Sequence, residues 1–176
     1  SLTTTTFTGL IPGQIYNITV SPVNNSGTGF SKSVTITTLP EGVTNLQSSS
    51  ITINSFSVSW TRGLGDASYN YYISNSTIPF NVNSINLLST LTNSVNFSQL
   101  LPGTLYNIYI IPLNSNGDAG VPSTILIETL PNPLTIINPI LSSIGINVFN
   151  ISWPSDNSTN SYLCQVLPGT HCPITY

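Results

Sequence analysis

Hydrophobic and polar residues alternate strictly in several short stretches of this chain. Phe56, Val58 and Trp60 alternate with serines, and the stretches 16–20 and 106–110 alternate in the same way. An alternation with a period of two is typical of strands that turn one face to a core and the other to water. Clusters of Ser, Thr, Asn, Gly and Pro separate these stretches, and no useful length of chain has the 3.6-residue period of a helix. The pattern predicts an all-β sandwich.

A repeat of about 90 residues organises the chain. The segment 10–18 reads LIPGQIYNI, and the segment 100–108 reads LLPGTLYNI. Pro22, Asn24 and Gly27 recur 90 residues later. Further matches, at offsets of 91 and 93, join residues 38–40 to 129–131 and residues 58–60 to 151–153. A unit of this length is too long for a helical solenoid repeat and suits a small β-domain.

These residues resemble the fibronectin type III domain. The shared features are a Trp that closes one alternating strand (Trp60), a Tyr about ten residues later (Tyr69), the motif Leu-x-Pro-Gly-x-x-Tyr-x-Ile-x-Ile at 100–110 and a Pro-bounded linker. The resemblance covers essentially the whole chain. It implies that Tyr106, and Tyr16 in the earlier copy of the motif, are tyrosine-corner residues whose hydroxyls bond to nearby backbone. It says little about function, because this scaffold serves many roles.

The Leu-Pro pairs at 39–40 and 130–131 resemble junctions between domains of this family. We therefore expect residues 40–130 to form one complete domain, residues 1–39 the last strands of another, and residues 131–176 the first strands of a third. Placed tail to head, the two partial units make one plausible whole. A half-sandwich alone would expose its core and its strand edges, so we expect either a longer periodic chain or subunits that share strands, both giving a head-to-tail filament. The alternative is an arbitrary fragment with collapsed ends.

The charge content excludes several classes of function. Two basic and five acidic residues make up 4% of the chain, against about 25% in ordinary soluble domains. Binding to nucleic acid needs lysines and arginines for the phosphates, and a polybasic membrane patch needs them too. With a single histidine and few carboxylates, acid–base catalysis is not expected, and neither is a cofactor. No apolar stretch is long enough to span a membrane as a helix.

Six Asn-x-Ser/Thr sequons are present, about the number expected by chance in a chain rich in Asn, Ser and Thr. Three of them lie between inward-facing residues of alternating strands, and the others fall in loops or near strand ends, so we expect all six to face solvent. N-linked glycans would explain how so uncharged a chain stays soluble, although polar faces also simply contain Asn. The six asparagines are Asn17, Asn24, Asn75, Asn96, Asn150 and Asn157.

Cys164 and Cys172 flank a turn with the sequence Pro168-Gly169. The turn would fold the chain back and place the two cysteines on adjacent strands. In an extracellular protein such a pair predicts a local disulfide, and free thiols are the alternative. Two Cys and the single His171 cannot complete a tetrahedral zinc site without further ligands.

Three acidic residues are the candidate metal ligands. In a fibronectin-like topology the loop with Asp66, the loop with Asp118 and the linker with Glu41 lie at one end of the sandwich. Together they would make a weak Ca²⁺ site. The simpler interpretation is that they are ordinary loop acids in water, with Arg62 near Asp66.

The sequence thus predicts an extracellular or cell-surface glycoprotein segment with a structural or adhesive function: a spacer, stalk or filament. Its partners would be neighbouring domains and further copies of itself. The alternatives are a ligand- or carbohydrate-binding ectodomain, for which Tyr69 and Phe30 are the candidate exposed aromatics, and an ancillary module of a secreted hydrolase. Adhesion through an Arg-Gly-Asp loop is not predicted, because the corresponding loop reads Asn116-Gly117-Asp118.

Overall fold

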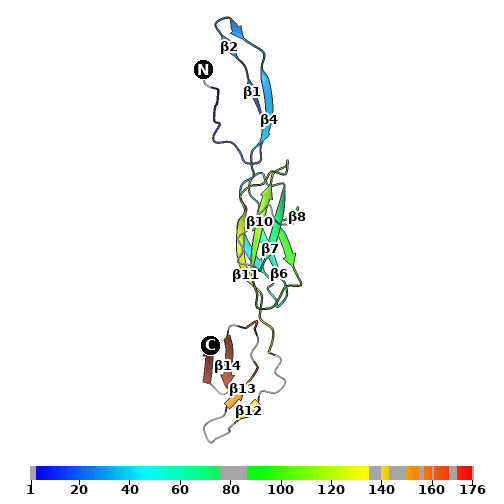
Figure 1. Ribbon diagram of the computed structural model, residues 1–176, viewed down its shortest axis with the longest axis vertical. Helices are drawn as coiled ribbons and strands as arrows, with labels where there is room; N and C mark the ends of the chain where they lie inside the picture. Colours follow the sequence, from blue (N-terminus) through cyan, green and yellow to red (C-terminus); the bar gives the residue numbers. More distant parts are fainter. Residues whose placement is uncertain are drawn as a thin grey trace.

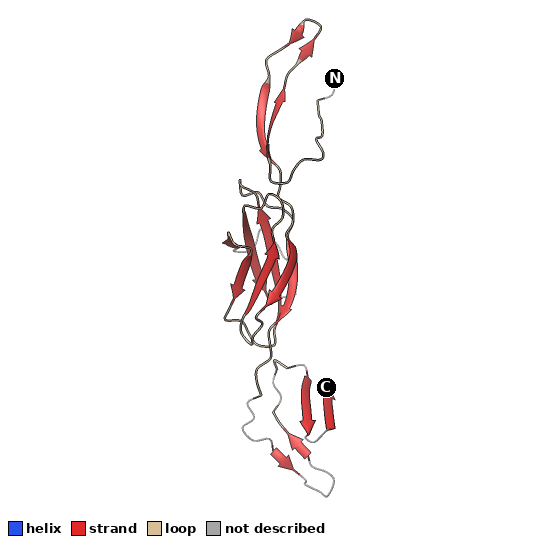
Figure 2. Cartoon of the chain, turned by 180° about the vertical axis from the view of Figure 1, so that it is seen from behind, coloured by secondary structure: helices blue, strands red, loops and turns tan. Residues whose placement is uncertain are grey.

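The computed structural model describes residues 3–75, 87–134, 140–142, 150–154, 157–159, 161–166 and 170–175. Within these ranges all helical or extended secondary structure is β-strand, as the alternation predicted (Figure 2). The strands are β1 Ile15–Val20, β2 Val23–Asn24, β3 Gly27–Thr28, β4 Lys32–Thr37, β5 Thr44–Ser49, β6 Phe56–Thr61, β7 Ser68–Ser74, β8 Leu88–Thr90, β9 Ser94–Phe97, β10 Leu105–Leu113, β11 Ser123–Glu128, β12 Ile140–Ser142, β13 Asn150–Ser152, β14 Ser161–Val166 and β15 Thr170–Thr175.

The middle of the chain, from β5 to β11, forms a two-layered sandwich, called here the central sandwich. One sheet has the strand order β5-β6-β9 and the other β11-β10-β7-β8. All pairings are antiparallel, with Phe56 opposite Phe97 in one sheet and Ile108 opposite Ile73 in the other. A bulge between Thr44 and Gln47 interrupts the pairing of β5 with β6. This is the sandwich that the sequence predicted.

The core of the central sandwich is aromatic and β-branched. Phe56, Val58 and Trp60 of β6 are all buried, whereas the serines between them are half-buried or exposed. The rings of Trp60 and Tyr69 meet edge to face with centroids 5.1 Å apart, a favoured aromatic geometry. Trp60 is therefore a packing residue, and Tyr69, which is fully buried, is not an exposed ligand-binding aromatic.

The N-terminal segment, residues 3–39, extends from one end of the central sandwich (Figure 1). Its strands β1 and β4 pair antiparallel, with Tyr16 opposite Ile36, and β2 and β3 form a short hairpin. Residues 3–8 form no strand. The segment therefore consists of these two antiparallel pairs, and no second sheet formed by described residues packs on them.

The C-terminal segment, residues 131–175 in the described ranges, lies beyond the opposite end of the sandwich (Figure 1). It contains the pairs β12–β13 and β14–β15. The rings of Trp153 and Tyr162 meet at 5.7 Å and 68°, which repeats the Trp60–Tyr69 pair 93 residues later. Along the described ranges there is no helix of the length and apolar character needed to cross a membrane.

Candidate functional site

The repeated Pro-Gly motif forms the same tyrosine corner twice. The hydroxyl of Tyr106 accepts a hydrogen bond from the amide of Leu101 at 2.8 Å. The hydroxyl of Tyr16 accepts one from the amide of Ile11, also at 2.8 Å. Both hydroxyls bond back across the Pro-Gly turn, as the family resemblance implied. The corner fixes the shape of the turn, and the turn is the surface that each unit presents to the next.

A threonine ties each turn to the end of its ribbon. Thr129 Oγ1 donates to the carbonyl of Leu101 at 2.6 Å and accepts from the amide of Thr104 at 3.0 Å. Thr38 makes the two equivalent bonds in the N-terminal segment, again at 2.6 and 3.0 Å. Because each threonine begins a Thr-Leu-Pro linker, the linker leaves both ribbons from a fixed position.

At the first junction, the Pro-Gly turn of the N-terminal segment rests on a loop of the central sandwich. A Cβ atom added to Gly65 would lie 2.6 Å from the amide nitrogen of Gly13 and 2.6 Å from the carbonyl oxygen of Pro12. No side chain fits at that distance. Gly13 also has a φ of +65°, which other residues adopt only with strain. The two backbones thus touch directly.

A buried asparagine closes the same junction. Asn114 is 2% exposed. Its Nδ2 donates to the carbonyl of Thr38 and to Asp118 Oδ2, both at 3.1 Å, and its Oδ1 accepts the amides of Asn116 and Asp118 at 3.0 and 2.9 Å. Asn116 Nδ2 donates to Thr37 Oγ1 at 2.7 Å. All four hydrogen-bonding positions of the Asn114 amide are used, so this residue fixes the loop and the neighbouring segment together.

The linker between the two parts is held as well. The amide of Glu41 donates to the carbonyl of Leu64 at 2.9 Å, and the amide of Leu64 donates to Glu41 Oε2 at 3.3 Å. Gly120 approaches Pro40 so closely that an added Cβ would lie 2.7 Å from the proline carbonyl oxygen. The linker of the first junction is therefore bonded and packed along its length.

The second junction, between the central sandwich and the C-terminal segment, reuses the Pro-Gly turn. A Cβ added to Gly103 would lie 2.6 Å from the carbonyl carbon of Ser158, and Gly103 has a φ of +52°. The amide of Asn132 donates to Ser158 Oγ at 2.9 Å. A groove of about 530 Å³ lies at this junction, lined by Leu101, Pro102, Gly103, Thr104, Asn132, Asn157 and Ser158.

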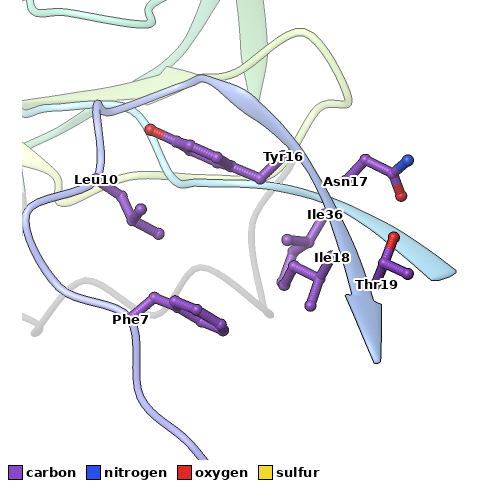
Figure 3. A pocket seen from close by; sticks show the side chains of 7 residues that line it. All are labelled: Phe7, Leu10, Tyr16, Asn17, Ile18, Thr19 and Ile36. Carbon is purple, nitrogen blue, oxygen red and sulfur yellow. The ribbon is translucent and has the colours of Figure 1, made fainter. Parts of the chain in front are cut away.

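An apolar face of the N-terminal segment is uncovered. Figure 3 shows Phe7 and Leu10 on the strand-free stretch facing Tyr16, Ile18 and Ile36 of the β1–β4 ribbon. The space between them, about 280 Å³, is open to solvent. The equivalent residues of the central sandwich are packed between its two sheets.

The three candidate calcium ligands do not gather at one point. The contacts of Asn114 and Glu41 confirm that the two loops and the linker meet at one end of the sandwich. Among the described residues, however, no three His, Cys, Asp or Glu side chains are close enough to share a metal ion. One carboxylate oxygen of Glu41 accepts a hydrogen bond from the Leu64 amide, and one of Asp118 accepts a hydrogen bond from Asn114 Nδ2.

Asp66 is not the loop acid in water that the simpler interpretation assumed. It is buried, and its Oδ2 accepts the amide of Gly63 at 2.9 Å. Burial raises the pKa of this carboxyl, and the Gly63 hydrogen bond and the nearby Arg62 offset only part of the rise. The Arg62 guanidinium donates to the backbone carbonyl of Asp66. The same surroundings raise the pKa of Tyr69, chiefly through burial and then through the Asp66 charge.

All six sequon asparagines are exposed, as expected from the alternation for three of them and from their places in loops or near strand ends for the others. The informative case is Asn96, which lies between half-buried Val95 and buried Phe97 in a complete sandwich. Asn157 differs from the others because it lines the groove of the second junction. Whether glycans are attached stays a prediction.

The two cysteines are directly opposite in the backbone register of β14 and β15. Adjacent strands therefore carry them, as expected, and the disulfide itself stays a prediction. The predicted turn at Pro168-Gly169 lies outside the described residues. His171 belongs to strand β15, opposite Gln165.

Sequence reasoning missed the junction role of Asn114. The signal was present, because Pro112, Asn114 and Gly117 repeat Pro22, Asn24 and Gly27. A repeated Asn in a loop indicates a local turn. The loop of Asn24 does contain such a turn, because Asn24 Oδ1 accepts a hydrogen bond from the Ser26 amide at 2.9 Å. The contact to another segment became visible only in three dimensions.

Comparison with known proteins agrees with the fold of the central sandwich. The family model for the fibronectin type III domain matches residues 41–129. The receptor-type tyrosine-protein phosphatase eta of Gallus gallus is 29% identical over 174 residues, which is 94% of this chain and 12% of that protein. The receptor-type tyrosine-protein phosphatase H of Homo sapiens is 29% identical over 135 residues, or 76% of this chain and 12% of that protein. The chain thus spans about an eighth of these relatives.

Among solved structures, a segment of two fibronectin type III domains from chicken tenascin shares the fold. It superposes with a TM-score of 0.50 at 21% identity and covers 65% of each chain. At this identity the likeness describes the fold and no shared function.

Proposed function

Because the chain belongs to the fibronectin type III family, we propose that it is a structural segment of an extracellular or cell-surface protein, a spacer built of sandwiches joined in series. The observation that carries this proposal is the repeated junction. At both ends of the central sandwich a Pro-Gly turn of one part touches a loop of the next through backbone atoms. A repeated contact of this kind sets the distance and angle between successive units.

The proposed domain boundaries follow from the same repeat. Residues 40–130 are one complete unit, residues 1–39 the last strands of a second, and residues 131–176 the first strands of a third. The matching tyrosine corners and the matching Trp–Tyr pairs support this division.

The mechanism of the spacer is geometric. Glycines at the contacts, the Asn114 hydrogen bonds and the bonded linker limit the motion between units. A short proline-bounded linker with direct contacts is stiffer than a flexible Gly/Ser linker. The number of units then determines how far the ends of the protein are held apart.

The uncovered face of the N-terminal segment supports a continuous array. In the native protein we expect strands equivalent to β5, β6 and β7 to cover Phe7, Ile18 and Ile36, because an apolar face with a free strand edge invites aggregation. A preceding stretch of a periodic chain would supply them without new contacts. Another copy would supply them through its C-terminal segment, giving an open head-to-tail filament.

Two covalent features complete the proposal. N-linked glycans on the exposed sequons would provide the solubility that a chain with 4% charged residues lacks. A Cys164–Cys172 disulfide would pin the β14–β15 ribbon. No catalytic role is assigned to this segment.

Negative-stain electron microscopy of the native protein tests the spacer. We expect thin, unbranched rods or fibres whose beads repeat at one sandwich length. Compact particles in which the sandwiches bundle side by side would overturn the proposal.

A ligand-binding ectodomain is the second candidate, and Phe30 favours it because this loop aromatic is fully exposed. Binding of the intact protein to a glycan array, lost on Phe30→Ala, would support this function over that of a passive spacer. Unchanged binding, or none, would leave Phe30 without this role.

A further inference from the structure

The second junction contains a glycosylation sequon of its own. Asn157, Ser158 and Thr159 form the sequon. Ser158 is part of the contact itself, since its backbone touches Gly103 and its Oγ accepts the amide of Asn132 at 2.9 Å. Asn157 is exposed and lines the groove between the two parts. A group attached to Asn157 is therefore held at the opening of that groove.

The first junction differs at the equivalent position. Leu64 stands where the repeat places Asn157. Its carbonyl accepts a hydrogen bond from the Glu41 amide, and its amide donates to Glu41 Oε2. Asn132 takes the place of Glu41 at the second junction, where its amide donates to Ser158 Oγ. Beside the second linker lies the polar groove that Asn132, Asn157 and Ser158 help to line.

The groove has the chemistry of a carbohydrate site. Its volume, about 530 Å³, lies in the usual range of about 300–1,000 Å³ for small-ligand sites. Leu101, which is exposed, and Pro102 offer apolar surface for the C–H face of a sugar ring, and Asn132 and Thr104 supply polar groups beside it. The lining residues that the structure describes are all uncharged, which suits a neutral sugar.

We propose that Asn157 carries an N-linked glycan whose first sugars occupy this groove and hold the second junction closed. In the transfer, Asn157 Nδ2 forms a bond to C1 of the first sugar of a lipid-linked oligosaccharide diphosphate. The bond from C1 to the diphosphate oxygen breaks, and the displaced amide proton is released to a base. The glycan bridges Asn157 on one part and the Leu101–Pro102 surface on the other. The inference rests on the proposed extracellular location, because Asn-x-Ser/Thr sequons are glycosylated on the surface of secreted proteins.

The test uses the intact protein secreted from glycosylating cells, with four variants. Asn157→Gln and Thr159→Ala both abolish the sequon, the second without touching the asparagine. Thr159→Ser keeps the sequon, and Asn96→Gln removes a sequon on the face of the central sandwich as the matched control. Mass spectrometry measures occupancy, and hydrogen exchange of the Asn132 amide reports opening of the junction.

We expect an occupied Asn157, and exchange of the Asn132 amide accelerated by about tenfold in both sequon-breaking variants, the effect of one or two net hydrogen bonds. Thr159→Ser and Asn96→Gln should exchange like the wild type. An unoccupied Asn157 beside an occupied Asn96 overturns the inference and leaves the proposed function standing. Faster exchange in Asn157→Gln alone assigns the effect to the amide side chain and overturns the glycan role. A protein with no glycan at any sequon overturns both the inference and the glycosylated surface proposed above.

Discussion

The N-terminal ribbon and the ribbon of the central sandwich have almost the same sequence motif and differ in what covers them. Segments 10–18 and 100–108 make the same turn and the same tyrosine hydrogen bond. Their inward faces nevertheless differ, because Ile36 is 52% exposed and its counterpart Ile127 is 3% exposed. Local structure therefore follows from the motif, while burial depends on an opposite sheet.

Strand formation differs for the same reason. Phe97 belongs to β9, which pairs with β6, and it is 7% exposed. Phe7, 90 residues earlier, lies in a stretch without strand structure and is 56% exposed. Because an edge strand exists only through its ladder partner, residues 3–8 cannot form the equivalent strand in the absence of a strand like β6.

The largest expected effect separates these two phenylalanines. Phe97→Ala removes a ring packed against Phe56 and Tyr71, and we expect it to lower the free energy of unfolding of the central sandwich by about 3–5 kcal/mol. Phe7→Ala should leave that free energy unchanged within about 0.5 kcal/mol. Urea denaturation of both variants measures the difference. Equal losses would mean that the two regions form one cooperative core.

The junction glycine gives the next effect. Gly103→Ala forces a side chain into a left-handed backbone position and against Ser158. We expect a loss of about 1–2 kcal/mol from the backbone strain alone, together with release of the second junction. Small-angle X-ray scattering would detect the release as a broader distribution of interunit distances. If Gly103→Ala scatters like the wild type, this contact does not hold the units together. Leu105→Ala, at an exposed position on the same ribbon, is the control.

Removing the tyrosine-corner hydrogen bond should have a smaller effect on stability, and one that differs between the two ribbons. Tyr106→Phe deletes the bond from the Leu101 amide inside the central sandwich, and we expect a loss of about 1 kcal/mol. In residues 1–176 measured on their own, Tyr16→Phe deletes the same bond at an exposed turn, where water replaces it. Thermal unfolding should therefore shift for Tyr106→Phe alone. A shift of the same size in both variants would contradict the view that burial distinguishes the two ribbons.

The smallest effect is a pH dependence confined to one of two equivalent loops. Burial raises the pKa of Asp66, so the folded chain binds a proton more readily than the unfolded chain. The contribution of Asp66 to stability therefore rises as the pH falls through its folded-state pKa, and it is lost as the pH rises above that value. The repeat places uncharged Thr159 at the matching position of the C-terminal segment.

The difference in melting temperature between Asp66→Asn and the wild type, measured from pH 3 to pH 8, isolates this contribution. We expect the wild type to gain stability relative to Asp66→Asn as the pH falls. A difference that stays constant with pH, or one that changes in the opposite direction, contradicts the account.

Much of the fold could be predicted because the alternation in β6 and β10 is unusually strict, and because the motif around Tyr106 is specific to one family. The burial of Asp66 could not be predicted, since a loop acid next to a glycine looks solvated until the loop packs on another segment. The role of Asn114 could not be predicted either, because its hydrogen-bond partner at the junction, Thr38, lies 76 residues away in the sequence. Both residues lie at the junction, where contacts join distant parts of the sequence.

The central claim is that the uncovered ribbon of the N-terminal segment is completed by further strands in the native protein. Hydrogen exchange of the intact protein tests it most directly, by comparing the amides of residues 3–8 with those of β9. The account predicts slow exchange in both stretches, because both would be paired with a strand like β6. Rapid exchange at residues 3–8 beside protected β9 amides would contradict it.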